Sequence, residues 1–223
     1  MMEAERTLFL ACPTVRDELD ASLRSLNTAV EIRYLNDNYH SFPDKLRDRL
    51  QQELDAITGY ERVVLGFGFC GNAVLGLKNR DYELIIPRMD DCISMCLGSY
   101  ARRRELDTPH PNIYLSRGWL GGKRGTWAEY EHMKSRLDED TLSEIFRSMY
   151  KGHDRLYLLE TGAYDLEELE EQVRQYSAVC GLDYSRIQGS LSYFRALLSG
   201  PWGEDRYIVL PPHGIVRDYM LML

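Results

Sequence analysis

Two short apolar runs, each followed by a cysteine, dominate the middle of this sequence. Val63 to Phe67 and Leu84 to Ile86 have the length of buried β-strands, and each gives way to small and polar residues before helix-like sequence resumes. This alternation is typical of parallel sheets, in which helices connect neighbouring strands. Cys70 and Cys92 therefore fall beyond the carboxyl ends of strands, where open α/β sheets bind their ligands.

The N-terminal region repeats this pattern. Thr7 to Ala11 is another short apolar run, and it ends in Cys12 directly before a proline that suits the first turn of a helix. Because the carboxyl ends of parallel strands meet at one edge of a sheet, we predict that Cys12, Cys70 and Cys92 converge on one site. We expect helix N-termini at that edge to lower the pKa of these thiols and to favour the thiolate, which is the form that binds metals.

Hydrophobic periodicity predicts the remaining elements. Alternation or short apolar runs predict strands over 30–35, 112–115, 155–160, 184–187 and 207–210. Helical spacing predicts helices over 13–26, from Pro43 to Gly59, and over 127–137, 142–149, 166–179 and 191–198. The glycine-rich basic segment Ser116 to Gly125 is expected to be a loop, either a lid over the strand ends or an exposed connection whose Trp119 fills the core.

These elements predict the fold class α/β, with a mainly parallel, doubly wound, Rossmann-like sheet. We expect a single domain over residues 1–223, built of two related halves, 1–115 and 150–223, with helices and loops between them. The last predicted strand is followed by the segment Pro211 to Gly214. Taking this strand to run in the same direction as the others, we expect this turn and its His213 at the same edge as the cysteine turns.

The composition excludes several classes of function. The net charge is −8, and the 27 lysines and arginines are scattered apart from Arg102 to Arg104, so nucleic acid is not an expected partner. No apolar run approaches the ~18 residues of a membrane span, and the first six residues are too acidic to begin a secretory signal. We therefore expect a cytoplasmic protein. In that reducing compartment the five cysteines indicate metal binding or thiol chemistry rather than disulfides, unless each is a small buried apolar residue.

The three strand-end cysteines predict a metal site. Zinc and iron–sulfur clusters are held by deprotonated cysteines, and a fourth group can close such a site or leave it open for a substrate. The expected ligands are Cys12, Cys70 and Cys92, and the candidates for the fourth group are Cys96, Asp91 and His213. Arg88, just past its strand, adds positive charge, and Asp91 is placed to orient a ligand, so these two are the candidate catalytic residues.

A second interpretation rests on the glycines of the same stretch. Gly66 to Gly71 matches G-x-G-x-x-G, follows a strand, and has an aspartate pair about 20 residues further on, as in dinucleotide-binding sequences. Gly68, Gly71 and Asn72 would then contact the cofactor. We favour the alternative that the glycines let backbone and ligand approach closely, because the helix that must follow is short and interrupted by Gly76.

Several short motifs carry a resemblance to a known family. They are Cys70-Gly71-Asn72, Ile86-Pro87-Arg88 followed by Asp91-Cys92, and Leu97-Gly98-Ser99. With them, most of the chain resembles the DUF1638 family of bacterial and archaeal proteins, whose members commonly have a histidine where this chain has Asp90. The resemblance implies a setting in corrinoid-dependent methyl transfer in anaerobes and methanogens, with a corrinoid protein or a methyltransferase as the partner.

Two hypotheses of different class follow. In the first, the thiolates hold zinc or an iron–sulfur cluster in a protein that takes a small-molecule ligand and acts in one-carbon, corrinoid-linked methyl metabolism. It would be an enzyme, namely a methyltransferase-associated metalloprotein, or an accessory factor. In the second, the chain is a Rossmann-like module that binds a nucleotide or a similar anion, and its cysteines only pack. Metal content separates the two, because only the first requires it.

Overall fold

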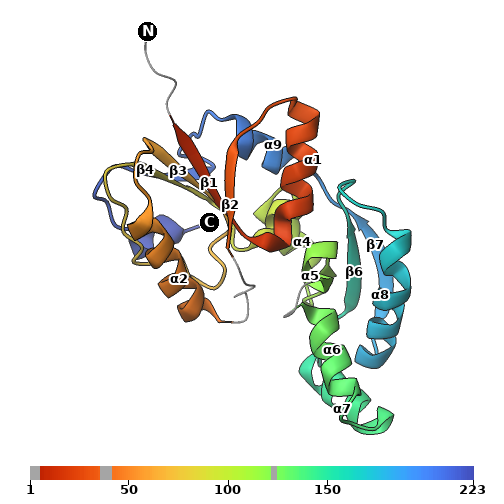
Figure 1. The fold of residues 1–223 in the computed structure, drawn as a ribbon. Helices are drawn as coiled ribbons and strands as arrows, with labels where there is room; N and C mark the ends of the chain where they lie inside the picture. Colours follow the sequence, from red (N-terminus) through yellow and green to blue (C-terminus); the bar gives the residue numbers. More distant parts are fainter. Residues whose placement is uncertain (1–5, 36–41, 122–124) are drawn as a thin grey trace.

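Among the described residues, five strands form the larger of two sheets (Figure 1). The computed structural model describes residues 6–35, 42–121 and 125–223. The strands of this sheet are β1 (Thr7–Ala11), β2 (Glu31–Tyr34), β3 (Arg62–Gly66), β4 (Glu83–Pro87) and β8 (Tyr207–Leu210), in the order β2-β1-β3-β4-β8. β1 to β4 are parallel, and Leu8 of β1 pairs with Val63 of β3. The prediction that these two strands are parallel neighbours is therefore confirmed.

β1, β3 and β4 are buried on both faces, which is why these strands read as continuous apolar runs, whereas β2 is partly exposed. Alternate residues of β1 and β3 belong to two separate hydrophobic cores. The first core includes side chains of α2 (Pro43–Ala56), and the second includes side chains of α1 (Arg16–Leu26) and α9 (Ser192–Ser199). Figure 1 shows α2 on one side of the sheet and α1 with α9 on the other, so the predicted doubly wound arrangement is confirmed.

Three parallel strands form the smaller sheet among the described residues. They are β5 (Ile113–Leu115), β6 (Arg155–Glu160) and β7 (Asp183–Gln188), in that order. The helices beside them are α5 (Arg117–Leu120), α6 (Thr126–Lys134), α7 (Glu139–Met149) and α8 (Glu167–Cys180). Tyr114 of β5 and Leu159 of β6 belong to the same core as α1 and α9, so the two sheets share buried side chains.

Short helical elements follow two of the parallel strands of the larger sheet, β1 and β4. They are η1 (Pro13–Val15) after β1, and α3 (Cys92–Leu97) with α4 (Tyr100–Leu106) after β4. Consecutive turns rather than a helix follow β3 over residues 70–76. A last short element, η2 (Asp218–Leu221), follows β8. The edge at which β1, β3 and β4 end is therefore built of tight turns.

The structure corrects the expected position of His213. β8 is antiparallel to β4, so its carboxyl end lies at the edge where β4 begins. There the His213 imidazole lies 3.2 Å from a carboxylate oxygen of Asp81, the residue two before β4. The expectation was wrong because it assumed that the last strand runs parallel to the others. An antiparallel strand ends at the opposite edge of the sheet. His213 is therefore excluded as a fourth ligand beside the three cysteines.

The segment predicted as a glycine-rich loop contains a helix. Arg117–Leu120 forms α5, and the hydroxyl of Ser116 accepts a hydrogen bond from the Trp119 amide at its first turn. Residues 122–124 of that segment lie outside the described residues. The sheets also do not divide at the boundaries expected for related halves, since β5 pairs with β6 and the last strand returns to the first sheet.

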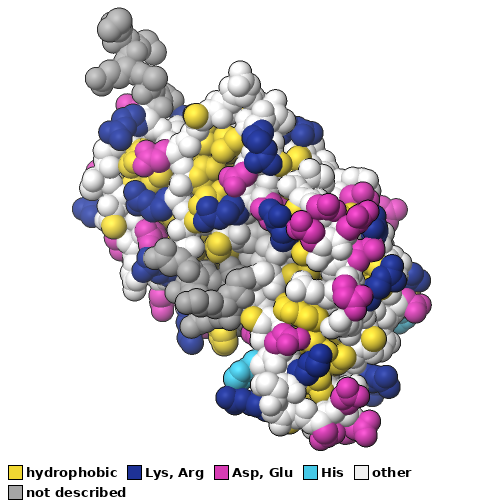
Figure 2. All heavy atoms as spheres, turned by 45° about the vertical axis from the view of Figure 1, so that its right-hand side comes forward, with side chains coloured by type: hydrophobic (Ala, Val, Ile, Leu, Met, Phe, Trp, Pro, Cys, Tyr) yellow, Lys and Arg dark blue, Asp and Glu magenta, His cyan; other side chains and the backbone are white. Residues whose placement is uncertain are grey.

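Two further properties concern the outside of the molecule. On the face that Figure 2 shows, lysine and arginine side chains are interspersed with acidic ones, so this face carries no continuous basic stripe. No helix formed by the described residues has the length and apolar character needed to cross a bilayer.

Candidate functional site

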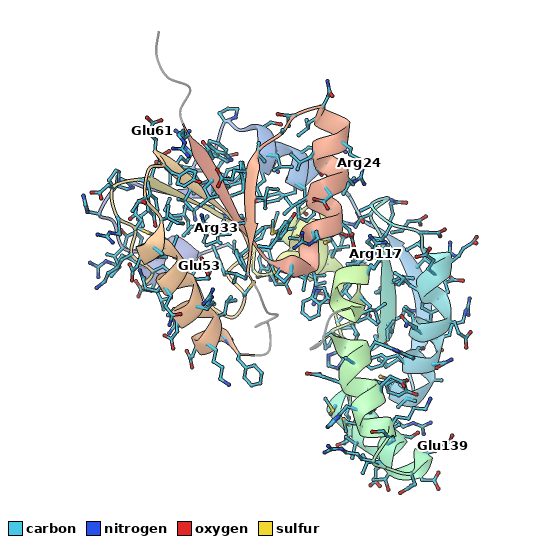
Figure 3. All side chains as sticks on the ribbon, viewed as in Figure 1. Arg24, Arg33, Glu53, Glu61, Arg117 and Glu139 are labelled. Carbon is cyan, nitrogen blue, oxygen red and sulfur yellow. The ribbon has the colours of Figure 1, made fainter. Side chains whose placement is uncertain are left out.

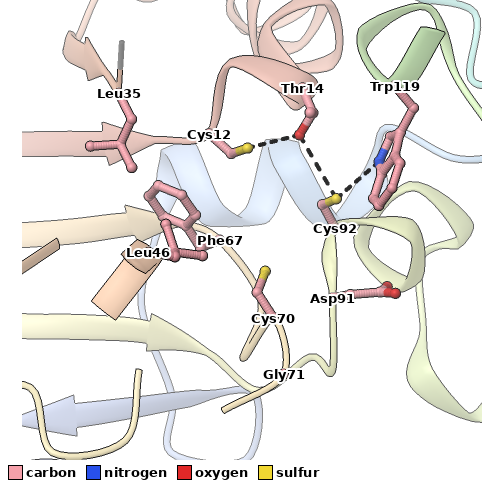
Figure 4. A pocket seen from close by; sticks show the side chains of 10 residues that line it. All are labelled: Cys12, Thr14, Leu35, Leu46, Phe67, Cys70, Gly71, Asp91, Cys92 and Trp119. Atoms are coloured by element: carbon pink, nitrogen blue, oxygen red, sulfur yellow. Dashed lines mark hydrogen bonds between the residues drawn. The ribbon is translucent and has the colours of Figure 1, made fainter. Parts of the chain in front are cut away.

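A pocket of about 160 Å³ lies at the edge where β1, β3 and β4 end (Figure 4). Its lining residues are Cys12, Thr14, Leu35, Leu46, Phe67, Cys70, Gly71, Asp91, Cys92 and Trp119. The structure thus brings Cys12, Cys70 and Cys92 together in one pocket, and all three are free thiols. We call this the thiol pocket.

Each cysteine is placed by backbone contacts next to the end of its strand. The Cys12 amide donates to the Gly66 carbonyl at 3.3 Å, which extends the pairing of β1 with β3 by one residue. The Cys70 amide donates to the Asp90 carbonyl at 2.7 Å and so ties the turn after β3 to the turn after β4. Cys92 is the first residue of α3, whose N-terminus is capped by the Asp91 carboxylate accepting from the Ser94 amide at 2.9 Å. Strand pairing and helix capping therefore fix all three positions.

A chain of hydrogen bonds connects two of the thiols. The Thr14 hydroxyl donates to the Cys92 sulfur at 3.8 Å and lies 2.9 Å from the Cys12 sulfur. Either the Cys12 thiol or the Thr14 hydroxyl can be the donor of the second bond. The sulfurs of Cys12 and Cys92 are therefore less than about 7 Å apart, although bound zinc needs them closer, with bonds of ~2.3 Å.

Trp119 enters the pocket from the side of the smaller sheet. Its indole N–H donates to the Cys92 sulfur at 3.2 Å, as Figure 4 shows. The helix that carries it, α5, is held by Arg117, which is labelled in Figure 3. The Arg117 guanidinium forms an ion pair with Asp17 of α1, and its Nε donates to a carboxylate oxygen of Asp17 at 2.8 Å. Residues associated with both sheets therefore line the thiol pocket.

Burial controls the protonation of the thiols. Desolvation raises the pKa of Cys12, Cys70 and Cys92, and their proximity to one another raises it further for Cys70 and Cys92. Hydrogen bonds from Thr14 and Trp119 act in the opposite direction and are weaker than the burial. The expectation that helix N-termini lower these pKa values is therefore wrong, because desolvation by burial is the largest influence on all three thiols.

The pocket offers the donor atoms of a soft-metal site. Thiolate sulfur is the ligand type that selects zinc and iron–sulfur clusters. Within the ranges that the structure describes, however, no three histidine, cysteine, aspartate or glutamate side chains are grouped closely enough to hold a metal ion as they stand. The types of ligand atom in the pocket thus fit a metal ion. The spacing between the cysteine sulfurs is that of neutral, hydrogen-bonded thiols.

The glycine motif packs backbone against backbone. A Cβ atom added at Gly68 would lie 2.7 Å from backbone atoms of Asp91, and one added at Gly66 would lie 2.7 Å from the Cβ of Ala11. The backbone amides of Phe69 and Cys70 donate hydrogen bonds to the carbonyls of Met89 and Asp90, which follow β4. No helix among the described elements starts in the turns over 70–76. A helix N-terminus, which holds a pyrophosphate through its backbone amides, is therefore not formed at this turn.

The other predicted site residues lie in different surroundings. Arg88 donates to the backbone carbonyls of Glu204 and Met220 at 2.9 Å each, which ties the end of β4 to the C-terminal segment. Asn72 has a left-handed backbone conformation, and its carbonyl accepts from Arg47 at 3.1 Å. Cys96 is buried one helical turn after Cys92 and packs in the core shared by the two sheets. Asp91 lines the pocket, and burial raises the pKa of its carboxyl group.

Sequence reasoning missed Thr14 and the apolar wall. Thr14 lies two residues after Cys12, and a hydroxyl so close to a proposed ligand is a usable signal for a group that orients it. Leu35 and Leu46 gave no such signal, because their spacing is that of ordinary core residues. The sequence indicates Trp119 only as part of a lid or as a core residue. Its contact with Cys92 depends on how the two sheets pack.

Comparison with known proteins gives one match. A family model described as "Protein of unknown function (DUF1638)" matches residues 34–198. No curated protein matches the chain, and no solved structure does.

Proposed function

The chain belongs to the DUF1638 family, whose description leaves its function open, and we propose that its thiol pocket binds zinc or an iron–sulfur cluster. One observation carries this proposal: Cys12, Cys70 and Cys92, which follow three different strands, line one pocket. Packing alone does not require three thiols at one point, whereas soft metals are held by thiolate sulfur.

The residues of the pocket have distinct roles in this proposal. Cys12, Cys70 and Cys92 would hold the metal, for which their side chains would have to turn toward one another. The Thr14 hydroxyl and the Trp119 indole N–H donate to sulfur, which stabilises the charged thiolate and orients it. Leu35, Leu46 and Phe67 keep water away from the sulfurs.

Three protein ligands would leave one position open for a substrate, as catalytic zinc sites in general do. A bound zinc ion would supply Lewis acidity there, while a cluster would supply electrons. We propose the setting that the family resemblance implies, corrinoid-dependent methyl transfer, with the protein as an enzyme or an accessory factor. A methylcobalamin demethylation assay with a thiol acceptor tests this setting, and an unchanged methylcobalamin spectrum with the metal-loaded protein would count against it.

The contacts of the glycine turn argue against a nucleotide as the ligand. A pyrophosphate needs free backbone amides at a helix N-terminus, and two amides of the glycine turn, those of Phe69 and Cys70, are instead bonded to the segment after β4.

Metal analysis of anaerobically purified protein tests the proposal. We expect close to one zinc ion or one cluster per chain, and a brown colour in the second case. Cys12→Ser, Cys70→Ser and Cys92→Ser should each lower the metal content at least about tenfold, because loss of a group that only orients a ligand already costs 10–100-fold in affinity.

Cys180→Ser is the matched control. Cys180 is also a buried, free cysteine, but it packs beside the smaller sheet and away from the thiol pocket. Its metal content should equal that of the wild type. Metal-free wild-type protein, or equal metal in all four variants, would refute the proposal.

A further inference from the structure

We infer that the thiol pocket takes a small, uncharged thiol with a short hydrocarbon chain. This inference rests on the proposed function, because the ligand sulfur would occupy the position that the three cysteines leave open. Three properties of the pocket support it: its volume, its apolar wall and its charge.

The volume limits the ligand to a few atoms. The pocket measures about 160 Å³. A cavity of about 150 Å³ in a protein core accommodates benzene, which has six non-hydrogen atoms. A ligand of about five to eight non-hydrogen atoms therefore fits, whereas a nucleotide does not.

The wall opposite the sulfurs is hydrocarbon. Leu35 lies just after β2, Leu46 belongs to α2, and Phe67 follows β3, while the Trp119 ring covers the side next to Cys92. These four side chains offer apolar contacts to a ligand chain. Each methylene that moves from water into such surroundings should raise affinity about fourfold.

The charge of the pocket disfavours an anion. Asp91 is the one charged side chain among the described lining residues. Three thiolates would outweigh a divalent ion, so the loaded site is negative. Three arginines near the pocket are paired with carboxylates outside it: Arg47 with Asp44, Arg103 with Asp107, and Arg117 with Asp17. A carboxylate, sulfonate or phosphate on the ligand would therefore be repelled.

A matched pair of ligands tests the charge argument. Cobalt(II)-loaded protein is titrated under anaerobic conditions with methyl 3-mercaptopropionate and with 3-mercaptopropionate, and binding is followed by the sulfur-to-cobalt charge-transfer absorption. The ester differs from the acid in charge and in one added methyl group, which by itself accounts for about fourfold in affinity. We expect the uncharged ester to bind at least tenfold more tightly. Equal or tighter binding of the anion would overturn the inference, even if cobalt binds as proposed.

A chain-length series tests the wall. Ethanethiol, 1-propanethiol and 1-butanethiol should bind with affinities that rise about fourfold per methylene. Leu46→Ala should reduce this increment, whereas Leu50→Ala should not, because Leu50 is buried on the same helix and does not line the pocket. Equal increments in the two variants would overturn the placement of the ligand chain.

A measurement without metal separates the two proposals. The fluorescence of Trp119, taken as the difference between wild type and Trp119→Phe, is followed as metal-free protein is titrated with the ester. If cobalt does not bind and the ester still alters this fluorescence, the pocket takes uncharged ligands and the metal proposal fails. If the ester binds neither form, the inference is wrong.

Discussion

Glu18 is a buried carboxyl group between the two sheets. Its side chain is fully buried on α1, and one oxygen accepts from the hydroxyl of Thr161, which follows β6, at 3.1 Å. The other oxygen has no hydrogen-bond partner in the described part of the chain. Arg117, whose positive charge acts on Glu18, is engaged with Asp17. Burial raises the pKa of Glu18 to about 7.

This shift predicts a pH-dependent stability. The folded-state pKa lies above the ordinary value of 4.5, so the folded protein binds more protons, and the free energy of unfolding falls as pH rises from about 4.5 to about 7. The loss should approach about 3 kcal/mol. Urea unfolding at pH 5 and pH 8 measures it. Glu18→Gln should remove most of this fall, and Glu144→Gln, at an exposed position, should retain it. Equal pH dependence in wild type and Glu18→Gln would contradict the assignment.

Helix α5 depends on the absence of a side chain at Gly118. A Cβ atom there would lie 1.9 Å from the carbonyl oxygen of Thr14, so α5 contacts η1 backbone to backbone. This contact sets the distance between Trp119 and Cys92. The same helix therefore joins the two sheets and closes one side of the thiol pocket.

Gly118→Ala should displace α5. We expect a loss of about 1–3 kcal/mol in the free energy of unfolding, typical of overpacking, together with a red shift of the Trp119 emission as the indole leaves the pocket. Gly121→Ala is the milder control, because its Cβ atom would lie 3.1 Å from the carbonyl oxygen of Arg117. An unchanged emission spectrum in Gly118→Ala would show that Trp119 is placed by other contacts.

The sequence predicted elements best where local signals agree. The strand at 7–11 is a clear apolar run directly before a proline that starts a helix. The helix that begins at Pro43 combines a clear hydrophobic period with a proline at its start. The helix Arg117–Leu120 was missed, since one helical turn that contains Gly118 and ends at Gly121 has no periodicity to detect. The direction of β8 was also missed, because an apolar run of four residues reads the same in parallel and antiparallel pairing.

At the scale of the whole molecule, one topological rule predicted the site. Parallel strands end at one edge, and the structure places the three cysteines in one pocket at that edge. The division of the chain into two sheets was not predictable in this way. Strand order and the return of the last strand depend on long-range packing, which leaves no local pattern. Trp119 in the pocket is a consequence of that packing.

The most direct test of this account is the sulfur coordination of the bound metal. X-ray absorption at the zinc edge of zinc-loaded protein counts the neighbouring atoms and measures their distances. The account predicts three sulfur neighbours at ~2.3 Å, and one fewer in Cys70→Ser. Coordination by nitrogen and oxygen alone, or an unchanged number of sulfur neighbours in Cys70→Ser, would contradict it.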